Sequence, residues 1–179
     1  MGLFDKLMGR ELPERRDARK IYFRLLEQAR TPGLFGNGRF ADDFDGRIDS
    51  IALHMAVLME RLQSEGEDGR LLNQALFDEM KDDFEIALRE QAIGDTGVKK
   101  RMKPIIGHFY DRLKAYTDGL KAEDPASEVS GAVRTEDGEN ASFADRMGRY
   151  ATAFLGALKD TSMKDLTAGR FYFPDVDAV

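Results

Sequence analysis

The chain has 179 residues, of which 42% are hydrophobic and 34% are charged, and its net charge is −6. This composition is typical of a soluble globular protein of one domain that is long enough to bury a core. The acidic balance argues against a general DNA-binding protein, whose surface would be basic. Because cysteine is absent, disulfide bonds, thiolate metal sites, iron–sulfur clusters and covalent haem attachment are excluded. Two histidines are too few for a histidine-rich metal site, and we expect no metal and no cofactor.

The first twelve residues carry a small apolar patch with basic residues nearby. No apolar run in the chain approaches the ~20 residues of a transmembrane helix. The amino terminus also lacks a signal-peptide core and mixes acidic with basic residues, so we expect a cytoplasmic protein. Segment 1–12 is expected either to contact a membrane interface or to dock on the body of the protein. The candidate membrane-contact residues are Leu3, Phe4, Leu7 and Met8.

The first helix is predicted to begin at Pro13, because a proline at the first helical position loses no hydrogen bond. Apolar residues at spacings of three and four follow as far as Ala29. The tripeptide Thr31-Pro-Gly33 ends this helix, and residues 34–44 are predicted to form a loop.

Segment 45–62 is strongly apolar and is predicted to form a central, buried helix. From residue 51 to 59 only His54 is polar, and a helix that is apolar nearly all round is usually buried. Arg47, His54 and Arg61 are spaced by seven and lie along one edge of the main apolar face. A catalytic histidine would need a nucleophile or a metal beside it, and the sequence indicates neither. We expect either a histidine that is hydrogen-bonded at a helix–helix contact or a row of three residues that faces a partner protein.

Two further long helices are predicted, from residue 70 to 91 and from residue 98 to 116. Pro104 lies inside the second pattern and should kink or restart the helix, because proline removes one backbone hydrogen bond. The two helices differ in charge. Residues 60–95 hold eleven acidic and four basic residues, whereas residues 99–114 hold six basic and one acidic residue.

The basic residues concentrate in the run Lys99-Lys-Arg-Met-Lys103 at the start of a helix. Cations at this end oppose the helix dipole, so the cluster is slightly unfavourable for the helix itself. Such a cluster suits docking to ribosomal RNA, anionic lipid or an acidic partner. The alternative is a solvated face whose cations pair with the acidic helix before it.

Residues 123–140 are acidic and rich in Gly, Ser and Pro, and are predicted to be a flexible connector with room for one helical turn. Ser142 and Asp145 resemble a capping box that opens a last long helix. The aromatic residues of tail 166–174 should pack back on the body. No strand pattern is convincing, so we predict an all-α fold. Residues 13–179 are expected to form a single compact helical domain of about five to seven helices around the buried central helix.

Short motifs between residues 45 and 112 occur in an order and spacing that resemble a known family. The motifs are Asp45-Gly-Arg-Ile-Asp49, Leu53-His-Met-Ala-Val57, Arg61-Leu62, Leu76-Phe-Asp78, Asp82-Asp83, Leu88-Arg-Glu90, Ile93-Gly-Asp95, Val98, Lys100-Arg-Met-Lys103 and Phe109-Tyr110 with Arg112. Together they resemble the ubiquinol–cytochrome c chaperone family, whose members assist assembly of the cytochrome bc1 complex. The short amino terminus is similar to the bacterial branch of the family. Pro104 departs from the uninterrupted helix expected of the family at this position.

The resemblance implies a non-enzymatic assembly chaperone of the cytochrome bc1 complex (respiratory complex III). Its expected partner is newly made cytochrome b or an early bc1 assembly intermediate, with the ribosome or the anionic inner-membrane surface as a further contact and no DNA. The implied location is cytoplasmic and peripheral to the inner membrane. The alternative is a membrane-surface or regulatory protein-binding module. The partner-binding candidates are Arg47, His54, Arg61, Asp95, Lys99, Lys100, Arg101, Lys103 and Tyr110.

Overall fold

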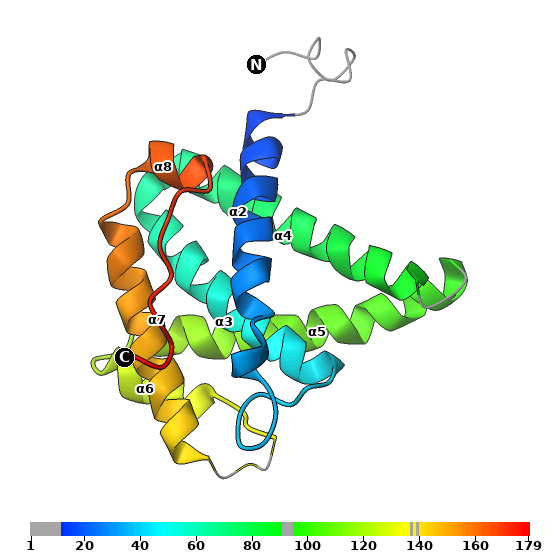
Figure 1. Ribbon diagram of the computed structural model, residues 1–179. Helices are drawn as coiled ribbons and strands as arrows, with labels where there is room; N and C mark the ends of the chain where they lie inside the picture. The colour runs from blue at the N-terminus through cyan, green and yellow to red at the C-terminus, as the bar shows by residue number, and fades with distance from the viewer. Residues whose placement is uncertain (1–11, 91–94, 137, 139) are drawn as a thin grey trace.

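The chain is built of helices joined by short loops (Figure 1). The structure is a computed structural model that describes residues 12–90, 95–136, 138 and 140–179. Over these residues it contains no strand, apart from an isolated bridge between Phe35 and Phe40. The predicted all-α fold of one compact domain is confirmed. The helices are α2 Pro13–Ala29, α3 Phe44–Leu62, α4 Gly66–Glu90, α5 Asp95–Leu120, α6 Pro125–Ala132, α7 Ala141–Lys159 and α8 Met163–Thr167, with 3-10 turns at Pro32–Leu34 and Gln63–Glu65.

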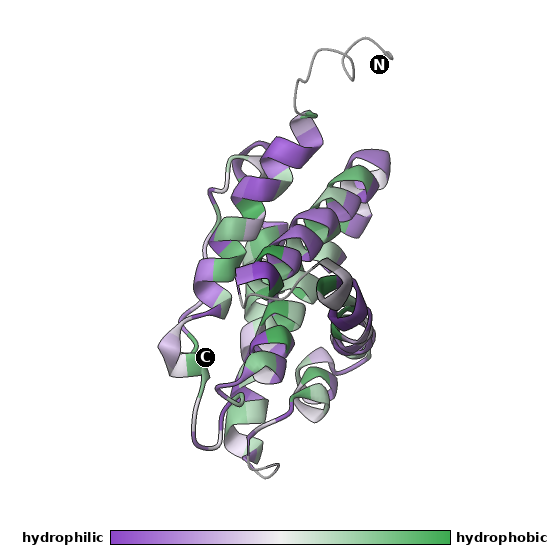
Figure 2. Cartoon of the chain, turned by 90° about the vertical axis from the view of Figure 1, so that its right-hand side faces the viewer, coloured by the Kyte–Doolittle hydropathy of each residue, from purple (hydrophilic) through white to green (hydrophobic). Residues whose placement is uncertain are grey.

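Helix α3 is the centre of the fold, as its apolar sequence predicts. Every side chain from Ile51 to Leu58 is buried. Asp43 caps its start, because its Oδ1 accepts a hydrogen bond from the backbone N–H of Gly46 at 2.8 Å. Helices α2, α4, α5 and α7 all pack against α3. Figure 2 shows hydrophobic and hydrophilic bands along the same helices, which is the pattern of amphipathic helices around a shared core.

The two longest helices of the described chain, α4 and α5, lie close together where α4 ends and α5 begins, and they spread apart toward the body of the protein (Figure 1). Helix α4 begins at Gly66, which has a φ of 60°, earlier than the predicted start at residue 70. Helix α5 continues through Pro104, so the predicted restart does not occur. Pro104 is exposed and removes one hydrogen bond from a helix that the core holds elsewhere, chiefly through Phe109 and Tyr116.

The predicted flexible connector at 123–140 contains a defined helix, α6, which is a correction to the sequence analysis. Asp124 caps α6 by accepting a hydrogen bond from the backbone N–H of Ser127 at 3.3 Å. Val129 is fully buried, and a Cβ on Gly148 of α7 would lie 2.1 Å from the backbone oxygen of Ala126. Helix α6 is therefore held by its close approach to α7, a tertiary contact that a short and weakly apolar sequence does not reveal.

Helix α7 begins at Ala141, and its N-cap is Asn140 rather than the predicted Ser142. The Asn140 side chain accepts a hydrogen bond from the backbone N–H of Phe143 at 3.1 Å. Asp145 instead accepts a hydrogen bond from Ser130 of α6 at 2.7 Å. The polar side chain that was expected to cap α7 thus joins α7 to α6.

The carboxyl-terminal tail packs its aromatic residues back on the body, as predicted. The ring of Phe173 lies 4.9 Å from that of Phe154 on α7 and 5.2 Å from that of Phe171, measured between centroids. Phe171 is buried, whereas Tyr172 between them is exposed. The tail therefore covers one side of α7 by presenting alternate residues to it.

Candidate functional site

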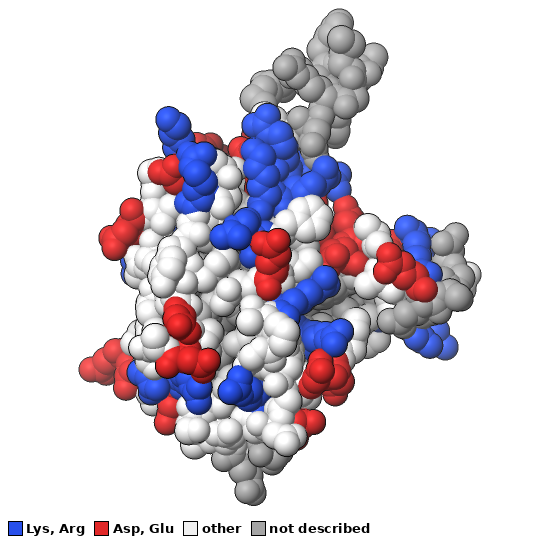
Figure 3. All heavy atoms as spheres, in the orientation of Figure 1, with Lys and Arg blue, Asp and Glu red and all other residues white. Residues whose placement is uncertain are grey.

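The start of α5 carries cations without ion-pair partners in the described part of the chain. Lys99, Lys100, Arg101 and Lys103, here called the basic cluster, are exposed. No ion pair among the described residues includes any member of the basic cluster, although acidic helix α4 lies beside α5. Figure 3 shows Lys and Arg side chains beside the loop where α4 ends and α5 begins. The basic cluster therefore adds charge to this surface without adding pairing to the fold.

Among the described contacts, acidic residues of α4 pair with α2, with its C-cap Arg30 or with arginines of α4 itself, and none pairs with α5. The carboxylate of Glu79 lies 3.2 Å from Arg15 and 3.1 Å from Arg19. The carboxylate of Asp83 lies 3.3 Å from Arg30 and accepts a hydrogen bond from the Tyr22 hydroxyl at 3.0 Å. The alternative interpretation, in which the acids of this helix neutralise the basic cluster, is therefore not supported by the described contacts.

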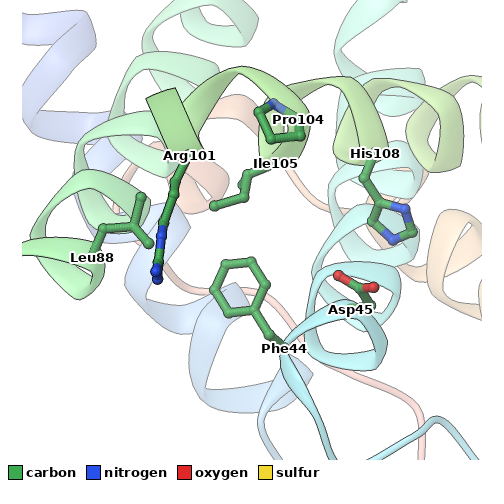
Figure 4. Close-up of a pocket in the computed structure, with 7 residues that line it drawn as sticks. All are labelled: Phe44, Asp45, Leu88, Arg101, Pro104, Ile105 and His108. Atoms are coloured by element: carbon green, nitrogen blue, oxygen red, sulfur yellow. The ribbon is translucent and has the colours of Figure 1, made fainter. Parts of the chain in front are cut away.

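A groove of about 520 Å³ runs between the start of α3 and α5, and we call it the α3–α5 groove. Figure 4 shows Phe44 rising toward Ile105, with Arg101 beside Leu88 and His108 above Asp45. Phe44 is 38% exposed although its ring is large and apolar. The α3–α5 groove therefore combines an apolar floor with one cation of the basic cluster and with charged or polar groups at its other end.

A second groove of about 410 Å³ lies on the α4 side of α5, and we call it the α4–α5 groove. Lys99 and Lys103 of α5 and Lys81 and Glu85 of α4 line it. The apolar side chains of the lining are Val98, Met102 and Ile106. The basic cluster thus borders apolar surface on both sides of the same helix. Such a surface suits an apolar segment that also carries acidic groups.

A buried polar network lies beneath the α3–α5 groove and joins α5 to α3. Asp49 is 3% exposed, and its Oδ1 lies 3.0 Å from Nε2 of His108 and 3.1 Å from Nε of Arg112. Arg112 also donates hydrogen bonds to the Tyr116 hydroxyl at 3.0 Å and to the backbone oxygen of Ala132. Burial raises the pKa of the Asp49 carboxyl, and Arg112 and then His108 oppose this effect. The network fixes the position of α5 relative to α3, and these two helices form the walls of the α3–α5 groove.

His54 is fully buried between α3 and α7. Its Nδ1 lies 2.7 Å from the backbone oxygen of Ser50, which can only accept, so Nδ1 donates and Nε2 accepts from the Tyr150 hydroxyl at 2.9 Å. Burial lowers the pKa of His54 to about 4, so the ring is neutral at pH 7. The interpretation of a histidine hydrogen-bonded at a helix–helix contact is confirmed.

The predicted row of three partner-facing residues on α3 does not form one exposed face. Arg61 is 8% exposed, and its Nε donates to the backbone oxygen of Leu158 at 2.9 Å, which joins the ends of α3 and α7. Arg47 is exposed and pairs with Asp42 at 2.9 Å. His54 and Arg61 are thus used inside the fold, because the core surrounds this helix on nearly all sides.

The other candidates differ in position. Tyr110 is 49% exposed and stacks on Phe77 of α4 with ring centroids 5.1 Å apart. Asp95 begins α5, but its side chain lies outside the described structure. The membrane-contact candidates Leu3, Phe4, Leu7 and Met8 also lie outside the described residues.

Sequence reasoning missed the network of Asp49, His108 and Arg112. Asp49 and Arg112 both belong to the motifs of the resemblance, but nothing in their spacing indicated that they meet. Among the described residues, no group of three or more His, Asp or Glu side chains is placed to hold a metal ion. No helix in the described ranges has both the length and the apolar character needed to cross a membrane.

The chain is similar to known proteins over most of its length. A family model described as Ubiquinol-cytochrome C chaperone matches residues 38–173, more than half of the chain. Among solved structures, the chain is similar to the crystal structure of the Cbp3 homolog from Brucella abortus, with a TM-score of 0.74 and 29% sequence identity. That match covers 99% of this chain and 97% of the other. No curated protein sequence matches the chain. The family match includes the basic cluster, both grooves and the network beneath them.

Proposed function

Because the chain belongs to the ubiquinol-cytochrome C chaperone family, we propose that it is a non-enzymatic chaperone that binds cytochrome b, or an early assembly intermediate, during assembly of the cytochrome bc1 complex. The family match and the likeness to the Cbp3 homolog support a role in bc1 assembly. The protein that is held during assembly is called the client below. We place this activity in the cytoplasm, at the periphery of the inner membrane.

We propose that the client binds over the start of α5, at the α3–α5 groove. The observation that carries this proposal is the basic cluster, which borders apolar grooves and has no ion-pair partner among the described residues. A membrane protein outside the bilayer exposes long apolar segments, and each Å² of apolar surface that a chaperone covers contributes about 25 cal/mol. Phe44, Pro104 and Ile105 supply such a cover, and Arg101 attracts acidic groups that flank an apolar segment.

The network of Asp49, His108 and Arg112 supports this placement. Its contacts fix α5 against α3 directly beneath the groove, so the docking surface is formed before a client arrives. A preformed surface loses less conformational entropy on binding than one that must first be ordered. Tyr110, half exposed and stacked on Phe77 of α4, instead continues the side of α5 that lines the α4–α5 groove.

The basic cluster also supports a second candidate function, a membrane-surface or regulatory binding module. Four exposed cations within five residues are attracted to ribosomal RNA or to anionic lipid without any apolar client. In that case the apolar lining of the grooves would contribute nothing to binding. The two functions therefore differ in whether the apolar residues or only the charges matter.

The test compares a strain lacking the protein with strains that express either the wild type or single variants. Loss of bc1 activity and of the cytochrome b absorbance band, with other membrane proteins at normal levels, is expected without the protein. Phe44→Ser should restore neither, because it removes apolar floor and leaves every charge in place. Tyr172→Ser, a change at an aromatic that is 66% exposed and far along the chain, is the matched control and should restore both. A cytochrome spectrum that is unchanged in the deletion strain would refute the chaperone function.

Photo-crosslinking locates the contact. A photoreactive residue placed at Arg101 should capture cytochrome b in cells, whereas the same residue at Tyr172 should not. Equal capture at both positions would show that the α3–α5 groove is not the binding surface. Capture only of ribosomal or lipid components at Arg101 would favour the second candidate function.

A further inference from the structure

The basic cluster is divided between two sides of α5. Arg101 and Ile105, which are four residues apart, line the α3–α5 groove. Lys99 and Lys103 line the α4–α5 groove together with Ile106, at spacings of four and three. Residues at these spacings share one face of a helix. Helix α5 therefore presents one cation on the side proposed for the client and two cations on the other side.

The α4–α5 groove carries positive charge that the described contacts leave unpaired. Lys81 of α4 borders it from one side, and Lys99 and Lys103 of α5 border it from the other. All three are exposed, and no ion pair in the described ranges includes any of them. Glu85, the one acid among the described lining residues, is already paired with Arg89 at 2.7 Å. The charge of this groove therefore favours an anionic ligand.

The floor of the α4–α5 groove is apolar. Val98 is 1% exposed and lies at the bottom, whereas Met102 and Ile106 are half-buried and remain open to a ligand. A methionine side chain adapts its shape to an irregular apolar ligand. Tyr110, four residues after Ile106, is half exposed and stacks on Phe77 of α4. A tyrosine with an apolar ring and a polar tip is suited to the boundary between apolar and aqueous surroundings.

The size of the groove favours a small amphiphile over a segment of a protein. Its volume of about 410 Å³ lies within the range of about 300–1,000 Å³ of small-molecule sites. The stretch of α5 from Lys99 to Ile106 is ~11 Å long at the helical rise of 1.5 Å per residue. A docked partner helix uses apolar anchors over at least two turns and an interface on the order of 1,000 Å². Met102 and Ile106 offer a shorter apolar strip, which suits a thin and flexible acyl chain.

The groove lies on a projecting part of the molecule. The end of α4 and the start of α5 stand out from the other helices (Figure 1). Ile86 of α4, the residue after Glu85, is 54% exposed. Exposed apolar side chains beside lysines are typical of helices that lie on a membrane surface. The position of the groove is therefore compatible with contact to a lipid headgroup layer.

We propose that the α4–α5 groove binds an anionic phospholipid of a membrane surface, with the phosphate among Lys81, Lys99 and Lys103 and the start of one acyl chain on Met102 and Ile106. The biological role of this site rests on the proposed function, because the lipid would hold the chaperone at the membrane while the opposite side of α5 holds the client. An acidic segment of a partner protein is the competing occupant and is an outcome of the test.

Two neighbouring isoleucines provide a matched pair of variants. Ile105 and Ile106 are both half-buried and pack against the core, but they line different grooves. The assay is flotation of the full-length chain with vesicles of equal parts phosphatidylglycerol and phosphatidylcholine. Ile106→Gln should weaken binding about tenfold, because it removes apolar contact with the acyl chain, whereas Ile105→Gln should bind like the wild type. If Ile106→Gln fails to fold, as its melting curve reports, Met102→Gln replaces it. Equal binding by the variants of the two grooves would overturn the proposal.

The charge requirement is tested at Lys81, which lies outside the basic cluster. Lys81→Gln should weaken vesicle binding about fivefold, the loss expected for one lysine at an anionic surface. The matched control is Lys164→Gln, which removes an exposed lysine of α8 and should bind like the wild type. Ile106→Gln should keep the wild-type salt dependence, since it removes no charge. Equal losses for the two lysine variants would show attraction by net charge alone, and the proposal would be wrong.

Fluorescence quenching locates the lipid. The chain has no cysteine, so Glu85→Cys in the groove and Lys164→Cys outside it each carry a single fluorophore. Phosphatidylglycerol with brominated acyl chains should quench the fluorophore at position 85 severalfold more than the one at position 164. Equal quenching at the two positions would overturn the proposal. Absence of quenching at both, together with failure of Ile106→Gln to support bc1 assembly in cells, would assign the groove to a partner protein instead.

These results are independent of the test of the chaperone function. Wild-type vesicle binding by both Ile106→Gln and Lys81→Gln would remove the lipid site and leave the proposed chaperone function standing. An unchanged cytochrome spectrum in the deletion strain would refute the chaperone function, whereas the vesicle results would still decide whether the α4–α5 groove binds lipid.

Discussion

Replacing Lys99, Lys100 and Lys103 by Gln should leave the isolated protein as stable as the wild type or slightly more stable. These side chains are exposed and have no ion pair within the described ranges, so no attraction is lost with them. The two like-charge pairs at helical spacing, Lys99 with Lys103 and Lys100 with Lys103, each destabilise a helix by about 0.2–0.5 kcal/mol. Relief of both repulsions contributes about 0.4–1 kcal/mol, and for a chain of this size 1 kcal/mol corresponds to about 2–4 °C in melting temperature. We therefore expect a rise of about 1–4 °C.

The same variant should bind more weakly to its target. Each cation that contacts single-stranded nucleic acid contributes about 0.7 to the slope of log affinity against log salt, so loss of three should make this slope shallower by about 2 for ribosomes. The assay measures melting temperature and salt-dependent pelleting with ribosomes or anionic vesicles on one preparation. The matched control replaces Lys114, Lys159 and Lys164 by Gln. It removes the same number of positive charges from outside the basic cluster and should keep the wild-type slope of log affinity against log salt. A fall of several degrees with unaltered pelleting would mean that the basic cluster serves internal ion pairing, and the proposed docking surface would be wrong.

Three further predictions concern the packing that positions this surface. Gly148→Ala should destabilise the protein by about 3 kcal/mol in urea unfolding, because the added Cβ would lie 2.1 Å from a backbone oxygen of α6. Gly156→Ala is the control: its added Cβ would meet nothing within 4 Å, so it should stabilise α7 by about 0.5–1 kcal/mol. Burial lowers the pKa of His54 from 6.5 to about 4, so between these pH values the histidine takes up a proton in the unfolded chain but not in the folded one. Stability therefore falls as the pH falls, and between pH 7 and pH 5 the wild type should lose about 2 kcal/mol more stability than His54→Gln. Arg112→Met should destabilise the protein by about 3 kcal/mol at pH 7, since it leaves the buried Asp49 carboxylate without its nearest cation, and a second change of Asp49→Asn should restore part of the loss.

The sequence determined the fold class and its central element. The apolar run from Ile51 to Leu58 is too long and too uniform for a surface helix, so the pattern alone predicted a buried one, and every side chain in it is buried. The aromatic tail and the helical stripes were predictable for the same reason, because burial of apolar surface is a property of each segment by itself. The motifs around α3, α4 and α5 were also sufficient to indicate the family that the match over residues 38–173 shows.

The partners of polar side chains were decided by the tertiary structure alone. Spacing placed Arg47, His54 and Arg61 on one helix edge, but only the packing of α7 on α3 buries His54 against Tyr150 and Arg61 against Leu158. The sequence likewise showed acidic α4 next to basic α5, yet α4 pairs with α2 and leaves the basic cluster beside apolar grooves. The reason is physical: hydrophobic periodicity is local, whereas an ion pair or a hydrogen bond depends on which distant helix face arrives within about 3 Å.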